Sequence, residues 1–188
     1  MKYLYTKAVS LLMAAILCTG MLTGCEALDT SLPPPEEKQE QQNQQKARPQ
    51  KAIEQIYQKV GKRTGLKEPT PQELEQEVGL DLTNDVAESY VRYVEGDFGA
   101  DDVYIILPKE GTDENGSSHR DNVITALKKR KEDRIKEFSN FDVYDSFRIA
   151  QDAVIFERGS YVVMLMLEDN DTARQIVEKY IPEKLNIS

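Results

Sequence analysis

The stretch AVIFERGSYVVMLML, residues 153–167, decides the fold. Two apolar runs, 153–156 and 161–167, are separated by four residues that include Gly159. A glycine takes the positive φ that a tight turn requires, so this pattern predicts a β-hairpin. In the second run apolar residues occupy both alternating positions, which indicates a central strand that is covered on both faces.

Two more strands are predicted before this hairpin. Residues 89–95 and 102–107 are rich in Tyr, Val and Ile, and glycines lie between them. A polar loop at 111–118 then leads into residues 118–139, whose apolar side chains recur at helical spacing. The segment 144–150 favours a short second helix.

A last helix is predicted after the hairpin, where Asn170 or Asp171 can cap it and Pro182 ends it. The order from residue 89 is therefore strand, strand, helix, strand, strand, helix. This order predicts an α+β fold with a four-stranded, mainly antiparallel sheet and packed helices.

The folded domain is predicted to begin at Thr70. Thr70 and Glu73 have the spacing of a capping box, Pro71 suits the first helical position, and Gly79 ends the helix. Before it, residues 52–60 show helical spacing and predict a short amphipathic helix that packs on the domain. Contact of this helix with a membrane is the alternative.

The N-terminal residues have the layout of an export signal. Lys2 and Lys7 precede an apolar run at 8–17, which is shorter than the roughly 20 residues that a membrane span needs. The sequence Leu22-Thr23-Gly24-Cys25 resembles the lipobox of bacterial lipoproteins, in which the cysteine thiol takes a diacylglyceryl group. We expect cleavage between Gly24 and Cys25 and a membrane partner through the diacylglyceryl anchor on Cys25; a retained anchor helix is the alternative.

Four segments follow from these signals. Residues 1–24 are the expected signal peptide, and 25–50 are the lipidated cysteine with a disordered tether of Pro, Gln, Glu and Lys. Residues 51–69 are a short helix and linker, and 70–188 are the globular domain. We expect the protein on the extracytoplasmic face of the cell membrane, where two acyl chains on one cysteine hold it stably.

Charge and cysteine content exclude several classes of function. Loss of Lys2 and Lys7 with the signal would lower the formal charge from −9 to −11, which disfavours nucleic acid as a partner. Cys18 would leave with the signal and Cys25 would be acylated, so no disulfide or cysteine metal site is expected.

No catalytic or metal site is predicted. His119 is the only histidine, and a loop histidine without a catalytic role is the expected interpretation. Residues 113–116 have oxygen ligands beside a glycine but lack the spacing of a calcium loop, so we expect a solvated turn. Asp101 and Asp102 are the carboxylates that acid–base chemistry would use.

A basic run in the long helix supplies the candidate binding residues. Its positive charges alternate with acidic residues, which is typical of an exposed face supported by charge pairs. Docking of an acidic partner is the functional hypothesis for Lys128, Arg130, Lys131 and Arg134.

The sequence also resembles the bacterial lipoprotein family defined by domain of unknown function 4358, over roughly residues 73–181 and the signal. The residues that carry the resemblance are 100–103, Leu127 and Arg134 in the helix, and 159–162 in the hairpin. The family often has Glu at the position of Asp102. The resemblance implies a small exported, membrane-tethered domain and implies no activity.

The leading hypothesis is therefore a lipid-anchored, non-enzymatic domain that binds an unidentified envelope protein or component, without a cofactor. The alternative is a small carboxylate-based hydrolase or ligand-processing enzyme at the cell surface.

Overall fold

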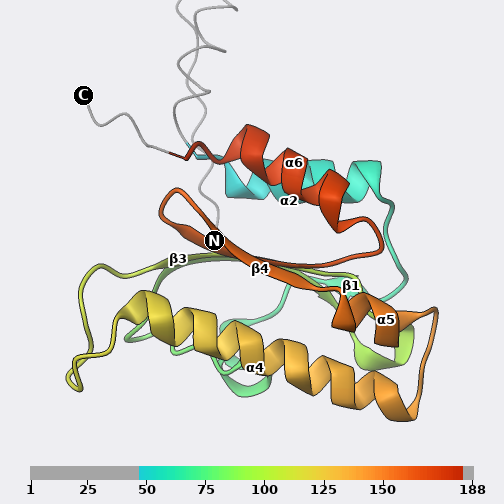
Figure 1. Cartoon of the computed structure of the whole chain (residues 1–188), viewed down its shortest axis with the longest axis horizontal. Helices are drawn as coiled ribbons and strands as arrows, with labels where there is room; N and C mark the ends of the chain where they lie inside the picture. Colours follow the sequence, from blue (N-terminus) through green and yellow to red (C-terminus); the bar gives the residue numbers. More distant parts are fainter. Residues whose placement is uncertain (1–46, 184–188) are drawn as a thin grey trace, which may run out of the picture. The chain divides into compact units, whose positions relative to one another are not determined.

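The computed structural model describes residues 47–183. The expected cleavage and lipidation at Gly24 and Cys25, the signal peptide and most of the expected tether lie outside this range. The described residues form three layers, with one sheet between two layers of helices (Figure 1).

The sheet has one strand more than predicted. Its strands form an antiparallel sheet in the order β1-β2-β3-β5-β4. The α+β class with an antiparallel sheet is confirmed, whereas the number of four strands is wrong. The missed strand has only two residues, too few to show a periodic pattern, and it pairs with the end of β2. The strands are β1 (Leu66–Lys67), β2 (Val86–Val94), β3 (Asp102–Pro108), β4 (Val154–Arg158) and β5 (Tyr161–Met166).

The predicted hairpin is confirmed as β4 and β5. Arg158 pairs with Tyr161, so Gly159 and Ser160 form a two-residue turn, and Gly159 has a φ of +57°. A Cβ at Gly159 would lie 2.6 Å from the carbonyl oxygen of Pro182, so this position also needs a residue without a side chain. All residues of β5 are buried, as expected for a central strand.

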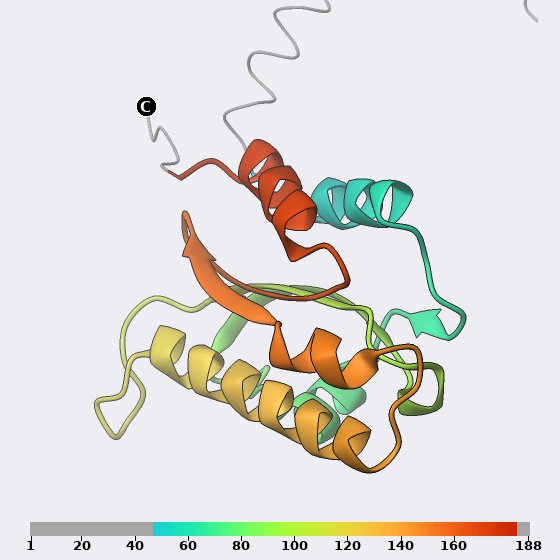
Figure 2. The same cartoon turned by 45° about the vertical axis from the view of Figure 1, so that its right-hand side comes forward.

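Helices cover both faces of this sheet. The helical elements are α2 (Pro49–Lys59), α3 (Pro71–Glu73), the π-helical turn η1 (Leu74–Val78), the 3₁₀ turn η2 (Gly96–Phe98), α4 (His119–Asn140), α5 (Ser146–Gln151) and α6 (Asn170–Tyr180). Figures 1 and 2 show α2 and α6 on one face and α4 and α5 on the other. Within residues 47–183, no helix combines the length and the apolar character needed to cross a membrane.

Two helix starts test the capping predictions. The capping box at Thr70 is present: its backbone N–H donates to Glu73 Oε2 at 2.7 Å, and its hydroxyl accepts from the Glu73 N–H at 3.3 Å. The last helix is capped one residue earlier than expected, because Asp169 Oδ1 accepts the backbone N–H of Thr172 at 2.9 Å. Asn170 instead accepts the N–H of Leu167 at 3.0 Å, which closes the turn after β5.

Helix α2 begins at Pro49, inside the expected tether, and its apolar side packs against the sheet. Ala52, Ile53 and Ile56 are buried in the cluster between this helix, α6 and the sheet. Helix α2 and strand β1 therefore belong to the same layered structure, although both precede Thr70.

Alternate residues of the central strands point into two separate cores. On β3, Val103 and Ile105 face α2 and α6, whereas Tyr104 and Ile106 face α4. This alternation explains why the apolar run in β5 has no polar face.

Candidate functional site

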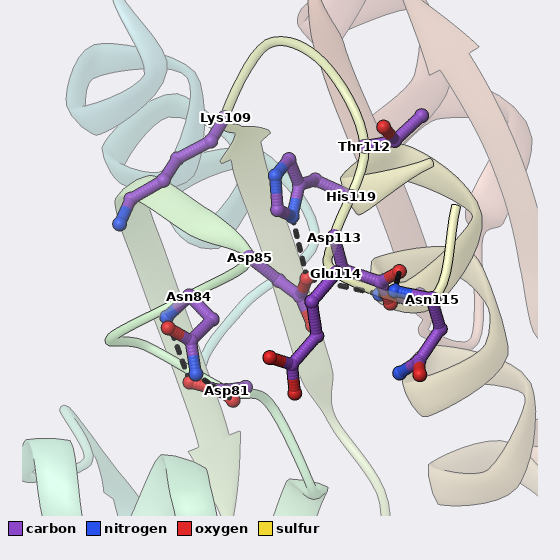
Figure 3. Close-up of a pocket in the computed structure, with 10 residues that line it drawn as sticks. Asp81, Asn84, Asp85, Lys109, Thr112, Asp113, Glu114, Asn115 and His119 are labelled. Carbon is purple, nitrogen blue, oxygen red and sulfur yellow. Dashed lines mark hydrogen bonds and ion pairs between the residues drawn. The ribbon is translucent and has the colours of Figure 1, made fainter. Parts of the chain in front are cut away.

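A polar hollow lies at the end of the sheet where β2 begins and β3 ends, and we call it the Asp85–His119 hollow. It has a volume of about 580 Å³ and is built from the turn before β2, the loop after β3 and the first turns of α4 (Figure 3). Its lining residues are Asp81, Asn84, Asp85, Lys109, Thr112, Asp113, Glu114, Asn115, His119 and Asn122.

An imidazole–carboxylate pair lies at the centre of this hollow. His119 Nδ1 lies 2.8 Å from Asp85 Oδ1, and each side chain is only 13% exposed. Local structure positions both groups, because His119 is the first residue of α4 and Asp85 directly precedes β2. The Asp85 carbonyl also accepts the N–H of Lys109 at 2.8 Å, which ties the β2 start to the β3 end. With the carboxylate at Nδ1, the other ring nitrogen is left for a ligand or a proton.

Asn122 joins this pair to the loop after β3. Its amide nitrogen lies 3.0 Å from both Asp85 Oδ1 and Asp113 Oδ2. The other oxygen of Asp113 accepts the backbone N–H groups of Asn115 at 2.8 Å and Ser117 at 2.9 Å. The Asn122 amide, and then the Ser117 N–H, hold the pKa of Asp113 below its usual value.

Residues 113–116 form an exposed turn, as predicted. The carboxylate of Asp113 is used to close its own loop, as an Asx turn does. Within residues 47–183, no group of three or more His, Cys, Asp or Glu side chains is placed to hold a metal ion.

The opposite wall of the hollow is also internally bonded. Asp81 accepts both the side-chain amide and the backbone N–H of Asn84 at 2.8 Å, and these bonds lower the pKa of Asp81. The Lys109 ammonium donates to the carbonyl of Thr83. The hollow can therefore offer hydrogen bonds and one imidazole to a ligand, and most of its charged side chains already make hydrogen bonds within the protein.

The two carboxylates of the enzyme hypothesis do not converge. Asp101 lines a separate hollow of about 280 Å³, beside Arg63 and Glu168, and its Oδ2 accepts the N–H of Arg63 at 3.2 Å. Burial raises the pKa of Asp101 to about 6. Asp102 is fully buried under α4, where its Oδ1 lies 3.2 Å from Arg134 Nη2.

The structure corrects the expectation of one exposed basic face on α4. Arg130 and Arg134 are 8% and 1% exposed, and Lys131 donates to the carbonyl of Ala153 at 2.6 Å; Lys128 is exposed. The two arginines lie in the buried stripe of the helix, which consists of Val123, Leu127, Arg130, Arg134 and Phe138. The helical spacing of these five residues can be read from the sequence, and it indicates that both arginines lie on the buried side of α4.

Sequence reasoning missed Asp85 and Asn122 entirely. Asp85 lies 34 positions before His119, so no local motif joins them. The one available signal was the single histidine at the predicted start of a helix, next to a polar loop.

The family described as "Domain of unknown function (DUF4358)" matches residues 59–167. The chain belongs to this family. Comparison with curated proteins and with solved structures found no match.

The DUF4358 match confirms the resemblance predicted from the sequence, with different limits. It begins at the end of α2 and ends after β5, so it includes β1 and leaves out α6. The Asp85–His119 hollow and the Asp102–Arg134 pair both lie within the matched residues.

Proposed function

We propose that this DUF4358 protein is a lipid-anchored, extracytoplasmic lipoprotein whose folded domain binds a partner at the cell envelope without catalysing a reaction. The observation that carries the proposal is the export signal that ends in Leu22-Thr23-Gly24-Cys25. Two acyl chains on Cys25 would hold the protein stably at a membrane.

The described residues begin beside the end of α6. The N–H of Arg48 donates to the carbonyl of Tyr180 at 2.9 Å, and its guanidinium lies 5.1 Å from the centre of the Tyr180 ring. The chain therefore joins the domain beside the end of α6, near the turn between β4 and β5. We call this the tether end of the sheet.

Substitution of the lipidated cysteine tests the anchor. Cells that express Cys25→Ser should incorporate no radioactive fatty acid into the protein, and the precursor should stay uncleaved. Cys18→Ser is the matched control, because this cysteine lies inside the expected signal and should leave labelling intact. Label retained on the Cys25→Ser protein would overturn the proposal.

Crosslinking in intact cells tests the binding role. A binding domain should yield a reproducible adduct with an envelope protein or component, and a deletion strain should show an altered envelope. Absence of both effects would contradict the proposal.

A second candidate, a carboxylate-based enzyme, has one favourable observation. Asp101 combines burial, a pKa raised to about 6 and a position beside a hollow, which are features of acid–base residues. The full chain should then hydrolyse a member of a panel of esters, amides and glycosides, and Asp101→Asn should abolish the activity. Equal rates for the two proteins, with a folded variant, would exclude Asp101 from catalysis.

A further inference from the structure

The two outer edges of the sheet differ in how they are protected. At one edge the outer strand β1 has only two residues, and β2 beside it has an irregular register between Val86 and Glu88. Short edge strands and bulges are devices that prevent pairing with another chain. At the other edge β4 pairs with β5 in a regular register along its whole length. We call the outer side of this strand the β4 edge, and Figure 2 shows β4 in front of the other strands.

The β4 edge carries backbone groups that have no partner in the described part of the chain. Arg158 pairs with Tyr161 across a two-residue turn, so the backbone groups of residues 154, 156 and 158 point toward β5. Those of Ile155 and Glu157 therefore point outward. No hydrogen bond joins these outward groups to any backbone group of residues 47–183. Every residue of β4 is partly or fully exposed, whereas all of β5 is buried.

The side chains of β4 favour pairing with another strand. Val154, Ile155 and Phe156 are β-branched or aromatic, and the strand contains no proline or lysine. Its exposed acid, Glu157, is paired with Arg120 at 2.5 Å. A regular, partly apolar edge of this kind is a template for an added strand.

The outward backbone groups determine how an added strand can lie. The carbonyl of Ala153 accepts the Lys131 ammonium at 2.6 Å, which leaves the groups of Ile155 and Glu157. These two residues lie symmetrically about Phe156. A second copy of β4, related by a two-fold axis at Phe156, places its Glu157 opposite Ile155 and its Ile155 opposite Glu157. Each facing pair then exchanges its N–H and carbonyl groups, as antiparallel strands do.

The side chains agree with this two-fold register. The Phe156 rings of the two copies face each other at a position without hydrogen bonds, where side chains are closest and aromatic pairs are favourable. Each ring lies 4.6 Å from the Arg174 guanidinium of its own chain, whose charge is paired with Glu178 at 3.2 Å. Val154 lies opposite Arg158, so no like charges stand directly opposite each other in this register.

The two ends of the β4 edge also carry opposite charges on the α4 face. Lys131 lies at the start of the strand, on the Ala153 carbonyl, and Glu157 lies at its end, beside Arg120. In the two-fold register Lys131 of each copy lies diagonally across from Glu157 of the other, so each carboxylate lies between two cations. A parallel second copy would instead place like charges together, which is unfavourable.

The proposed membrane anchor is compatible with the same symmetry. A two-fold axis that pairs two edge strands runs perpendicular to the sheet, so it keeps the α2 and α6 layers of both copies on one side. Each chain enters its domain at Arg48, next to the start of α2 in that layer. Both tethers would therefore leave from the same side, and anchoring on one membrane would raise the local concentration of the two copies.

We propose that this protein pairs with a second copy of itself through β4, in an antiparallel, two-fold arrangement that joins the two sheets into one. The pairing rests on the proposed function only for the shared membrane, because the β4 edge itself needs no lipid. An extended segment of another protein is the competing occupant that the experiment distinguishes.

Disulfide crosslinking of the full, lipidated chain in its membrane tests the proposal. The expected mature chain has no free thiol, because Cys18 is removed and Cys25 is acylated. Phe156→Cys places two thiols at the two-fold axis, at the roughly 4.5–5.5 Å Cβ separation of facing residues, which is close to the span of a disulfide. Mild oxidation should give a dimer. Glu88→Cys, exposed on β2, is the control and should give at least tenfold less dimer.

A second preparation separates failure of the anchor from failure of the pairing. Phe156→Cys in a full chain with Cys18→Ser and Cys25→Ser has one thiol and no lipid. At high protein concentration in detergent it should form the same dimer. A dimer here, without fatty acid labelling of the parent chain, would overturn the anchor and support the pairing.

Variants at Glu157 test whether the backbone of β4 makes the contact. Glu157→Pro removes an outward N–H and should lower the crosslinked fraction of Phe156→Cys at least tenfold. Glu157→Ala is the matched control, because it also loses the ion pair with Arg120 but keeps the N–H, and it should retain most of the dimer. Thermal denaturation checks that both variants fold.

A charge exchange keeps the proposal testable if Glu157→Pro does not fold. Lys131→Glu should reduce crosslinking several-fold, because it brings like charges together across the axis. Adding Glu157→Lys to the same chain should restore crosslinking. Lack of restoration would contradict the two-fold register.

Three further outcomes would overturn the proposal. Equal crosslinking from positions 156 and 88, or no dimer in either preparation, would show that β4 does not pair with its copy. Crosslinks of position 156 to another protein alone would assign the β4 edge to a different partner. An undiminished dimer in a folded Glu157→Pro variant would show that the two copies meet elsewhere.

Discussion

The two faces of the sheet are buried by different means. Between the sheet and helices α2 and α6 the buried cluster is made of apolar and tyrosine side chains, and the buried Asp101 lies only at its edge, beside the end of α2. Between the sheet and α4 the apolar cluster surrounds buried polar groups, of which Asp102 and Arg134 form an ion pair. The first face therefore stabilises the fold by apolar packing, whereas the polar groups of the second face also fix the positions of loops.

Arg134 links the second face to the loop around η2. Its Nη2 donates to the carbonyls of Val94 at 2.9 Å and Gly99 at 2.8 Å, as well as to Asp102. These carbonyls lie on either side of η2, so one guanidinium holds both ends of the loop that carries Phe98. Buried ion pairs seldom add net stability over an apolar core, but they fix geometry when their bonds are made.

The largest effect is expected from Asp102→Ala. This change leaves the buried Arg134 without its buried carboxylate and should lower the free energy of unfolding by about 3–5 kcal/mol. Denaturant titration measures it. Glu137→Ala is the matched control: Glu137 also pairs with Arg134, at 3.0 Å, but is 42% exposed, so a loss below about 1 kcal/mol is expected. Equal losses for both variants would contradict the assigned role of burial.

On the apolar face, Ile56→Ala should lower the free energy of unfolding by about 2–5 kcal/mol, because it opens a cavity under α2. Ile56 is fully buried. This loss should not change with salt concentration or with pH between 5 and 8, because the substitution removes only apolar atoms. A strong salt dependence of the loss in denaturant titrations would show that charged groups contribute to this face as well.

Asp101→Asn should stabilise the protein at neutral pH. Burial raises the pKa of Asp101 from 3.8 to about 6, so the folded state binds this proton more tightly than the unfolded state. The associated stability is complete below pH 3.8, is lost as the pH rises to about 6, and stays lost above it.

A difference of one unit between the pKa values of the folded and unfolded states corresponds to about 1.4 kcal/mol. Asp101→Asn should therefore raise the free energy of unfolding at pH 7 by about 2–3 kcal/mol. Asparagine keeps an oxygen to accept the Arg63 N–H. Denaturant titrations from pH 4 to pH 7 should show a smaller slope for the variant, and parallel curves for the two proteins would refute the assignment.

The smallest effect is expected at the margin of the α4 face. Asp85→Ala removes the partner of His119 and one of two acceptors of Asn122, and should cost about 1 kcal/mol. Thermal denaturation at pH 7 measures it. The neighbouring Glu114→Ala changes an exposed side chain and should stay within about 0.5 kcal/mol of the parent. A larger loss for Glu114→Ala would place the important contacts elsewhere in the hollow.

Much of the fold followed from local patterns. The hairpin at 153–167 and the capping box at Thr70 were predicted because a turn glycine and a cap act on their immediate neighbours. Strand β1 was missed because two residues carry no period, and its pairing with Tyr93 and Val94 depends on residues far along the chain.

The candidate site was much less predictable. The sequence predicts no role for His119, because its partner Asp85 comes from another element and only the packed sheet brings the two side chains within 2.8 Å. The arginines of α4 were assigned to solvent because charge outweighed their position in the helical stripe. Their burial requires Asp102, Tyr104 and backbone carbonyls to be ready as partners, and helical spacing cannot reveal partners.

The sequence alone therefore determined the class of fold, the family and the expected membrane anchor at Cys25, because periodicity, caps and cleavage signals depend on neighbouring residues. Only the tertiary structure decided which carboxylates are buried, which cations are paired and which aromatic rings stay in solvent. Those properties depend on burial and on distances between residues that are remote in sequence. The exposure of Phe98, Phe141 and Tyr144, for example, is set by loops that are remote in sequence and packed at one end of the sheet.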